Sequence, residues 1–254
     1  MRKPRENEQL NINLSVAGVP LPVAVSVPTQ RVSLRRMLPV IQKMSSELIA
    51  LGTKNLRESG KEVSCGAGCG ACCRQLVPVA EAEAYALSDL VEKMGEPRRS
   101  EIKARFNSAI EKLNSASFFK RLDEAAESEN EEDYDGMITE YFRFQIACPF
   151  LANESCSIHA SRPIACREYL VTSSPEFCST AEGDGVENVR HFFQVKEALI
   201  SLARRKTAER LPFVPLICSM EFARTNRGDS PKRTGREWMQ RFFTKLAEYS
   251  KPVD

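Results

Sequence analysis

Apolar and polar residues alternate near the start of the chain. Within residues 11–28 almost every second position is apolar, with one interruption at Ala17-Gly18. A period of two places successive side chains on opposite faces of a strand, so this segment predicts a β-hairpin with one buried face. An exposed strand edge of this kind is also open to a protein partner or a second copy of the chain.

The spacing of apolar residues changes to that of a helix from Ser33 onward. Apolar stripes with a period near 3.6 predict helices in five segments: 33–57, 87–94, 102–113, 192–202 and 238–246. Ser100 is expected to cap the third of these helices. The acidic tract at residues 123–135 is expected to form the solvated end of that helix and a surface loop.

These patterns predict an α+β fold, a helix-rich single domain with an N-terminal β-hairpin and a cysteine-rich metal-binding loop region. We expect the hairpin to occupy residues 1–30 and the helical domain residues 31–254. The helical part contains the cysteine region, at residues 63–180.

The first group of cysteines lies in a short glycine-rich segment. Its thiols belong to Cys65, Cys69, Cys72 and Cys73, with glycines at 66, 68 and 70. Intervals of two and three residues allow one loop to surround a tetrahedral ion, and glycine allows the backbone to turn tightly around it. Adjacent side chains diverge, so Cys72 and Cys73 do not readily bind one mononuclear ion. The pattern therefore favours two neighbouring centres or one polynuclear cluster.

The second group begins at Cys148-Pro-Phe-Leu and continues to Cys156, Cys166 and Cys178. Asn153 and Glu154 predict the turn of a short hairpin between the first two of these cysteines. Pro163 is expected to begin a helical turn that presents Cys166.

Together the two groups resemble the YkgJ-type cysteine-cluster family, whose CxxCxxCC domain is described as zinc- or iron-chelating. The chain matches its pattern at the first group, at Cys148-Pro-Phe-Leu, and at the segment from Cys156 through Arg162-Pro163 to Cys166-Arg167. The resemblance covers about residues 63–180 and implies a metal site. Its eight predicted ligands are Cys65, Cys69, Cys72, Cys73, Cys148, Cys156, Cys166 and Cys178.

Two positions depart from the family pattern. The first interval, after Cys65, has three residues instead of two, and His159 stands where the family has tyrosine. We expect His159 to occupy the place of the aromatic ring, with ligation as the alternative. Arg162 and Arg167 are expected to offset the thiolate charge, whereas Cys218 is expected to pack as a small apolar residue.

Composition and charge indicate which partners and which cellular compartment to expect. The 254 residues carry a net charge of only +2, which makes nucleic acid an unlikely partner, and no apolar run is long enough to cross a membrane. The first residues do not show the apolar run of a secretory signal, so we expect a cytoplasmic protein with reduced thiols.

Two functional classes follow from these observations. The first is a metal-binding protein that holds one or two zinc or iron centres in a structural or sensing role, because all eight candidate ligands are thiols. The second is an iron–sulfur enzyme, an oxidoreductase or a protein similar to S-adenosylmethionine-dependent protein methylases, since iron–sulfur clusters also take four thiolates. The sequence shows no other catalytic set, so whether the chain is an enzyme stays open, as do its partner and oligomeric state.

Overall fold

The computed structural model describes residues 6–16, 19–128, 130–180, 185–203, 211–226 and 231–250. It is rich in helix, with short strands and 3-10 turns, and the predicted helix-rich α+β fold is confirmed. The strands are β1 (Asn7–Val16), β2 (Val19–Pro28), β3 (Val32–Ser33), β4 (Pro78–Val79), β5 (Leu151–Ala152), β6 (Ser155–Cys156), β7 (Val214–Pro215) and β8 (Lys232–Arg233). The α-helices are α1 (Leu38–Glu58), α2 (Glu81–Glu92), α3 (Arg98–Ser115), α4 (Phe118–Glu127), α5 (Glu131–Arg143), α6 (Ile164–Glu168), α7 (Val195–Ala203), α8 (Ser219–Thr225) and α9 (Gly235–Tyr249).

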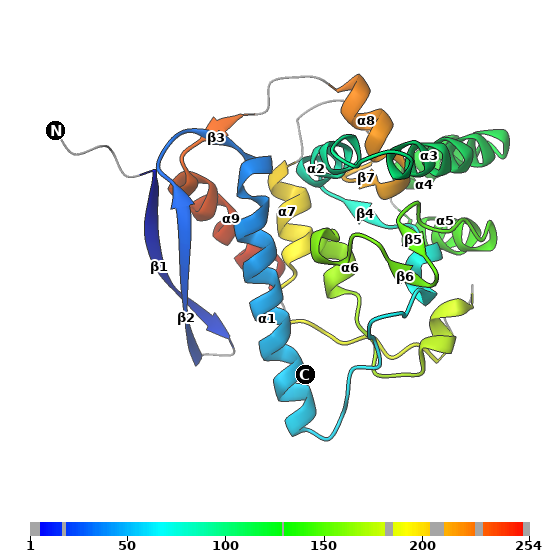
Figure 1. Cartoon of the computed structure of the whole chain (residues 1–254). Helices are drawn as coiled ribbons and strands as arrows, with labels where there is room; N and C mark the ends of the chain where they lie inside the picture. Colours follow the sequence, from blue (N-terminus) through cyan, green and yellow to red (C-terminus); the bar gives the residue numbers. More distant parts are fainter. Residues whose placement is uncertain are drawn as a thin grey trace.

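The N-terminal hairpin, β1 and β2, lies on one side of the molecule and packs on α1 and α9 (Figure 1). Its strands pair antiparallel over their whole length, from Asn7 opposite Pro28 to Val16 opposite Val19. Inward residues such as Val25 and Val27 are buried, as the period of two requires. The predicted hairpin is thus confirmed, although Ala17-Gly18 lies outside the described residues.

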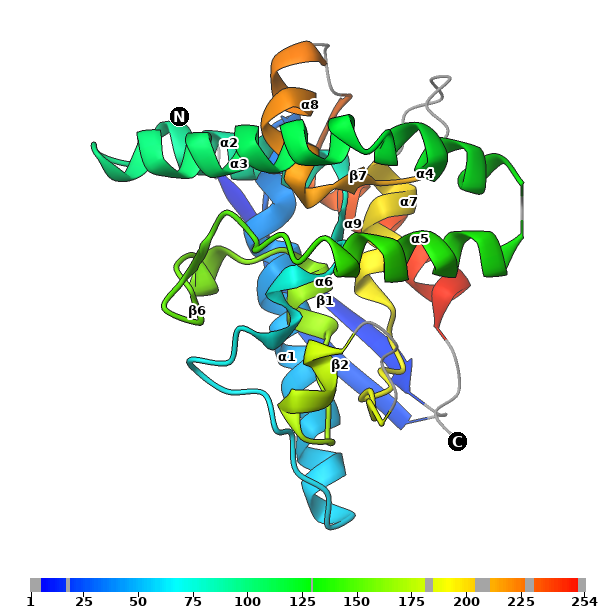
Figure 2. The same ribbon diagram turned by 90° about the vertical axis from the view of Figure 1, so that its right-hand side faces the viewer.

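Two hydrophobic cores organise the helices. The first joins the hairpin to α1, α7 and α9, and the second lies among α2, α3, α4, α5 and α8. Figure 2 shows α3 and α4 nearly in line, with α5 returning beneath them. The segments that carry the cysteines lie along the second core, against which Cys148 and Cys156 pack.

The apolar stripes predicted the positions of α1 and α9 closely. Pro39 lies in the first turn of α1, where its missing N–H removes no hydrogen bond of the helix. Ser100 does not cap α3, because that helix begins at Arg98. Instead Ser100 donates from its N–H and its hydroxyl to the Glu96 carboxylate, at 3.2 and 2.8 Å.

The acidic tract is more ordered than we expected. It contributes to two helices, α4 and α5, which pack on each other through one apolar face each. Leu122 and Met137 are buried between charged neighbours, and this packing outweighs the acidic composition. In the part of the chain that the structure describes, no helix is long and apolar enough to span a membrane. The division into residues 1–30 and 31–254 stays a prediction.

Candidate metal centre

The first cysteine loop turns where its glycines permit. Gly68 has a φ of +86°, a conformation that favours glycine. The loop then enters a 3-10 turn, Ala71–Arg74, which carries Cys72 and Cys73 side by side. The N–H of Cys69 donates to the Gly66 carbonyl and that of Cys73 to the Gly70 carbonyl, at 3.2 and 3.0 Å. These bonds hold the thiols of this group on one compact loop.

The second group begins on the short hairpin of β5 and β6. Asn153 and Glu154 have φ values of +50° and +53°, and they form the hairpin turn that the sequence predicts. The first loop packs directly on this turn, because a Cβ added at Gly70 would lie 2.8 Å from both Glu154 Oε2 and Leu151 Cδ1. Arg74 also forms an ion pair with Glu154, at 2.8 Å.

Hydrogen bonds from backbone N–H groups join the segments that carry the two cysteine groups. The N–H of Cys148 donates to the carbonyl of Cys73 at 2.7 Å. The N–H of Val171 donates to Cys65 Sγ at 3.4 Å. The structure therefore brings together segments that lie far apart in the sequence.

Two carboxylates position α6, the short helix that carries Cys166: Glu83 is buried and Glu168 is half-buried. Glu83 on α2 is only 3% exposed and accepts from the N–H groups of Ala80 and Ile164, at 3.0 and 2.8 Å. Glu168 at the end of α6 accepts from the first N–H groups of α7, those of Val195 and Lys196, at 2.8 and 3.1 Å. Burial raises the pKa of Glu83 and raises the pKa of Glu168 to about 7.

The sequence analysis missed both carboxylates. Glu83 stands four and eight residues before Leu87 and Val91, so it lies in the apolar stripe of α2. An acidic residue at such a position is a signal for a buried anchoring group. Glu168 gives no comparable signal, since its partners lie in a segment whose approach depends on the fold.

The cysteines fall into two neighbourhoods, each a set of thiols that are close enough to shift one another's pKa. The first contains Cys65, Cys69 and Cys178, together with Cys72. Burial raises the pKa of Cys65, and the nearby Cys69 and Cys72 raise it further. Burial also raises the pKa of Cys178, with contributions from Cys65, Cys72 and Cys69. Thiolates at these positions would repel one another, which is the situation that a bound cation relieves.

A second neighbourhood surrounds Cys166. Burial raises the pKa of Cys148 to about 12, and Cys156 and Cys72 add to this shift. Burial raises the pKa of Cys166 well above its usual value, and Cys148, Cys72 and Cys156 act in the same direction. Cys72 is therefore close enough to influence both neighbourhoods.

Cys72 and Cys73 are closer to each other than the divergence of adjacent side chains led us to expect. A hydrogen bond between the two side chains is the largest cause that raises the pKa of Cys72, followed by burial. The tight 3-10 turn Ala71–Arg74 permits this contact between adjacent side chains.

The thiols are neighbours, but they are not drawn into a coordination sphere. Among the described residues, which include all nine cysteines, no group of three or more His, Cys, Asp or Glu side chains is arranged to hold an ion. All nine cysteines are free thiols. The donor set itself fits a thiolate-binding metal such as zinc or iron, since sulfur ligands select these ions.

The arginines around the cysteines differ in their roles. Arg162 lowers the pKa of Cys65 and of Cys72 through its charge, although burial and the Cys73 contact outweigh it. Arg167 donates to the carbonyls of Arg162 and Ala160 and so holds the turn before α6. Arg74, in contrast, is committed to its ion pair with Glu154.

Two further predicted positions lie at the edge of this region. His159 is exposed, on the 3-10 turn His159–Ser161. Cys218 packs against the second core, and burial raises the pKa of its thiol to about 12. The structure thus places Cys218 among apolar residues, as its sequence neighbours indicated.

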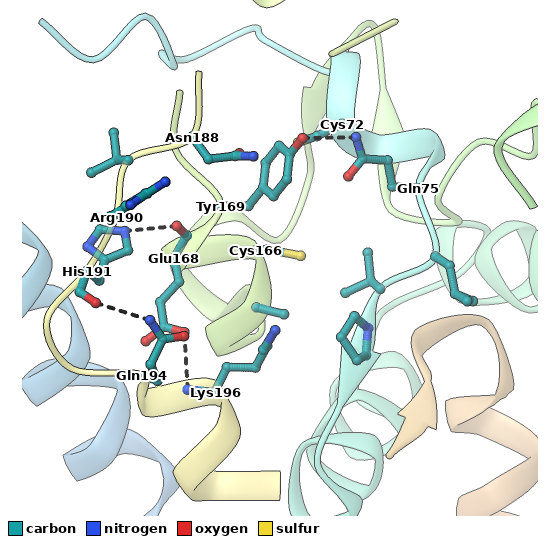
Figure 3. A pocket seen from close by; sticks show the side chains of 15 residues that line it. Cys72, Gln75, Cys166, Glu168, Tyr169, Asn188, Arg190, His191, Gln194 and Lys196 are labelled. Carbon is teal, nitrogen blue, oxygen red and sulfur yellow. Dashed lines mark hydrogen bonds between the residues drawn. The ribbon is translucent and has the colours of Figure 1, made fainter. Parts of the chain in front are cut away.

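A cavity of about 530 Å³ opens beside the cysteines (Figure 3). Cys72 and Cys166 form part of its wall, and Figure 3 shows the Cys166 sulfur directed into it. His191 lies here, in the segment before α7, and its Nε2 is 2.9 Å from the Glu168 carbonyl. The sequence did not indicate that the segment carrying His191 would line a cavity.

The comparison with known families decides what this region is. A family model named CxxCxxCC, described as a "putative zinc- or iron-chelating domain", matches residues 64–185. Residues 64–185 match the CxxCxxCC family model. The CxxCxxCC region thus confirms the resemblance and covers slightly less than half of the chain, and its description supports a metal-chelating cysteine cluster. No curated protein and no solved structure matches the chain.

Proposed function

We propose that the CxxCxxCC region holds two closely spaced zinc or iron centres. Cys65, Cys69 and Cys178 supply three thiolates to one centre, and Cys148, Cys156 and Cys166 supply three to the other. Cys72 and Cys73 provide the fourth thiolate of each. The observation that carries this division is the pair of neighbourhoods in which the thiols act on one another, with Cys72 close to both.

The proposed centres serve a structural or sensing role. Each would join segments from both halves of the region, because Cys178 lies 106 positions beyond Cys72 and Cys148 neighbours Cys72 in space. Binding an ion would draw the thiolates together and release protons, which couples metal loading to the order of residues 63–180. Arg162 would offset part of the charge of the thiolates.

Elemental analysis of anaerobically purified protein tests this function. We expect about two metal ions per chain, because eight thiolates complete two tetrahedral sites. The absence of a visible band would identify zinc, whereas a brown colour with acid-labile sulfide would identify an iron–sulfur cluster. Protein that contains no metal after anaerobic preparation would refute the proposal.

Single substitutions test the division of the ligands. Cys69→Ser and Cys156→Ser should each lower the bound metal by about one ion per chain and loosen residues 63–180, because each removes a thiolate from a different centre. Cys218→Ser is the matched control, since that thiol lies outside both neighbourhoods and should leave metal content unchanged. Full metal content in both test variants would show that the ligand assignment is wrong.

A second function, an iron–sulfur enzyme, is favoured by one observation. The cavity brings solvent to Cys72 and Cys166, whereas a purely structural site is usually closed. Reduction of the iron-loaded protein in the presence of S-adenosylmethionine, followed by analysis for its cleavage products, tests this alternative. The absence of turnover with an intact cluster would leave the structural or sensing role.

A further inference from the structure

The cavity beside the cysteines has the form of a ligand site. Its volume of about 530 Å³ lies within the usual range for small-molecule pockets. One wall comes from the end of α6, another from the segment between Gln75 and Pro78, and a third from residues 188–196. The two thiols in the wall belong to different cysteine groups of the sequence, Cys72 and Cys166.

The polar side chains of this cavity can both donate and accept hydrogen bonds. Amide groups from Gln75, Asn188 and Gln194 line it, together with the charged Arg190 and Lys196 (Figure 3). Two of these amides also have protein partners, since Gln75 donates to the Tyr169 hydroxyl at 3.2 Å and Gln194 to the His191 carbonyl at 3.1 Å. These bonds fix the orientation of the amides that face the cavity.

Apart from the two thiols, the charged side chains of the lining favour an anion, because Arg190 and Lys196 lie there with one carboxylate, that of Glu168. The carboxylate of Glu168 is the acidic group among the lining residues, and it is engaged by the first N–H groups of α7. Lys196 also contacts Glu197, at 2.7 Å, so its charge is shared, whereas Arg190 is exposed at the cavity. Guanidinium and ammonium groups beside fixed amides suit a carboxylate, whose oxygens accept several hydrogen bonds.

We propose that this cavity binds a small organic carboxylate, held by Arg190 and Lys196, next to the centre that contains Cys166. Only one part of this proposal, the metal centre beside the ligand, rests on the proposed function. The carboxylate recognition depends on residues outside the predicted ligand set, so the two can be tested separately. Such a ligand would lie against the thiol wall and would make the centre responsive to a metabolite.

Isothermal titration of the metal-loaded protein with succinate, glutamate and benzoate provides the test. At least one of these probes should bind and saturate at millimolar concentration, and inorganic phosphate should bind more weakly. Arg190→Gln and Lys196→Gln should each weaken binding about tenfold, as expected for the loss of a charged hydrogen bond. Lys43→Gln is the control, because that exposed lysine pairs with Glu47 on the surface of α1 and should leave binding unchanged.

Metal content is measured in every variant, which separates the two proposals. Saturable carboxylate binding that depends on Arg190 supports the site, even in protein that proves to hold no metal. The carboxylate site is overturned if no probe binds to fully metal-loaded protein, if phosphate binds equally well, or if Arg190→Gln behaves like Lys43→Gln. In each of these three cases the metal centre would still stand.

Discussion

Gly70 packs closely against the β5–β6 turn, which joins Cys148 to Cys156. A Cβ there would approach the Glu154 carbonyl oxygen to 2.9 Å in addition to two side-chain atoms. We expect Gly70→Ala to lower the free energy of unfolding by about 1–3 kcal/mol, the usual cost of overpacking. Denaturation with urea measures this change.

Gly66→Ala is the control for that measurement. Nothing lies within 4 Å of a Cβ built at Gly66, and its φ is not in the left-handed region. Equal stability changes in the two variants would show that the contact between the loop and the β5–β6 turn is unimportant.

Arg162 provides a second prediction at the scale of one residue. Its charge acts on Cys65 and Cys72, and its buried Nε has no hydrogen-bond partner among the described residues. We expect Arg162→Gln to weaken metal affinity about 10- to 100-fold, the effect typical of groups that surround metal ligands. Competition with a chromophoric chelator measures this affinity.

Arg74→Gln is the matched variant, because Arg74 also lies beside the cysteines but pairs with the exposed Glu154. Exposed ion pairs contribute little, so this variant should retain nearly full affinity. If the two arginine variants lose affinity to the same extent, Arg162 has no special influence on the thiolates.

At the scale of elements, Glu83 joins the start of α2 to the start of α6. Burial raises its pKa above 4.5, so the folded protein holds this proton more tightly than the unfolded chain does. The resulting stabilisation is complete below pH 4.5 and is lost as the pH rises through the raised pKa. Glu83→Gln cannot titrate, so the stability of the wild type relative to this variant should fall over that interval.

Thermal unfolding at a series of pH values checks the prediction. Glu92→Gln supplies the baseline, since Glu92 lies exposed on the same helix. A parallel pH dependence for wild type and Glu83→Gln would mean that the buried carboxyl is not the source. The Glu83→Gln variant should also loosen the contact between α2 and α6, because glutamine has one acceptor oxygen for the two N–H groups of Ala80 and Ile164.

The elements show where sequence patterns were sufficient and where they were not. Local periodicity located the N-terminal hairpin, α1 and α9, and turn-forming residues located the β5–β6 turn. Periodicity did not predict α4 and α5, because the acidic residues of one face obscured the buried Leu122 and Met137. Nearest-neighbour patterns also could not show that Glu168 would reach α7, since that contact depends on the tertiary arrangement.

At the scale of the whole molecule, the two cores allow metal removal to act unevenly. The first core, of the hairpin with α1, α7 and α9, contains none of the cysteines, whereas Cys148 and Cys156 pack against the second. We expect a chelator to increase amide hydrogen exchange within residues 63–180 and to leave α1 and α9 largely protected. Exchange measured by mass spectrometry before and after chelation checks this difference.

Uniform loss of protection would contradict that expectation and would indicate one cooperative unit. The same experiment on Cys218→Ser should repeat the wild-type result, because this thiol is outside the proposed ligand set.

The predicted cysteine ligands and the family resemblance came from the sequence, but the division of the ligands into two neighbourhoods did not. That division depends on which loops meet in space.

The hydrogen bond from Cys148 to the Cys73 carbonyl closes the chain on itself at the base of α2–α5. The chain leaves the cysteine region at Cys73 and returns to it at Cys148, and the tip of this excursion, formed by the end of α4 and the start of α5, is separated from Cys148 by the whole length of α5. Length changes at that tip should be absorbed locally. The tip is therefore a natural place to insert a fluorescent reporter or an affinity tag without disturbing the chemistry at the base.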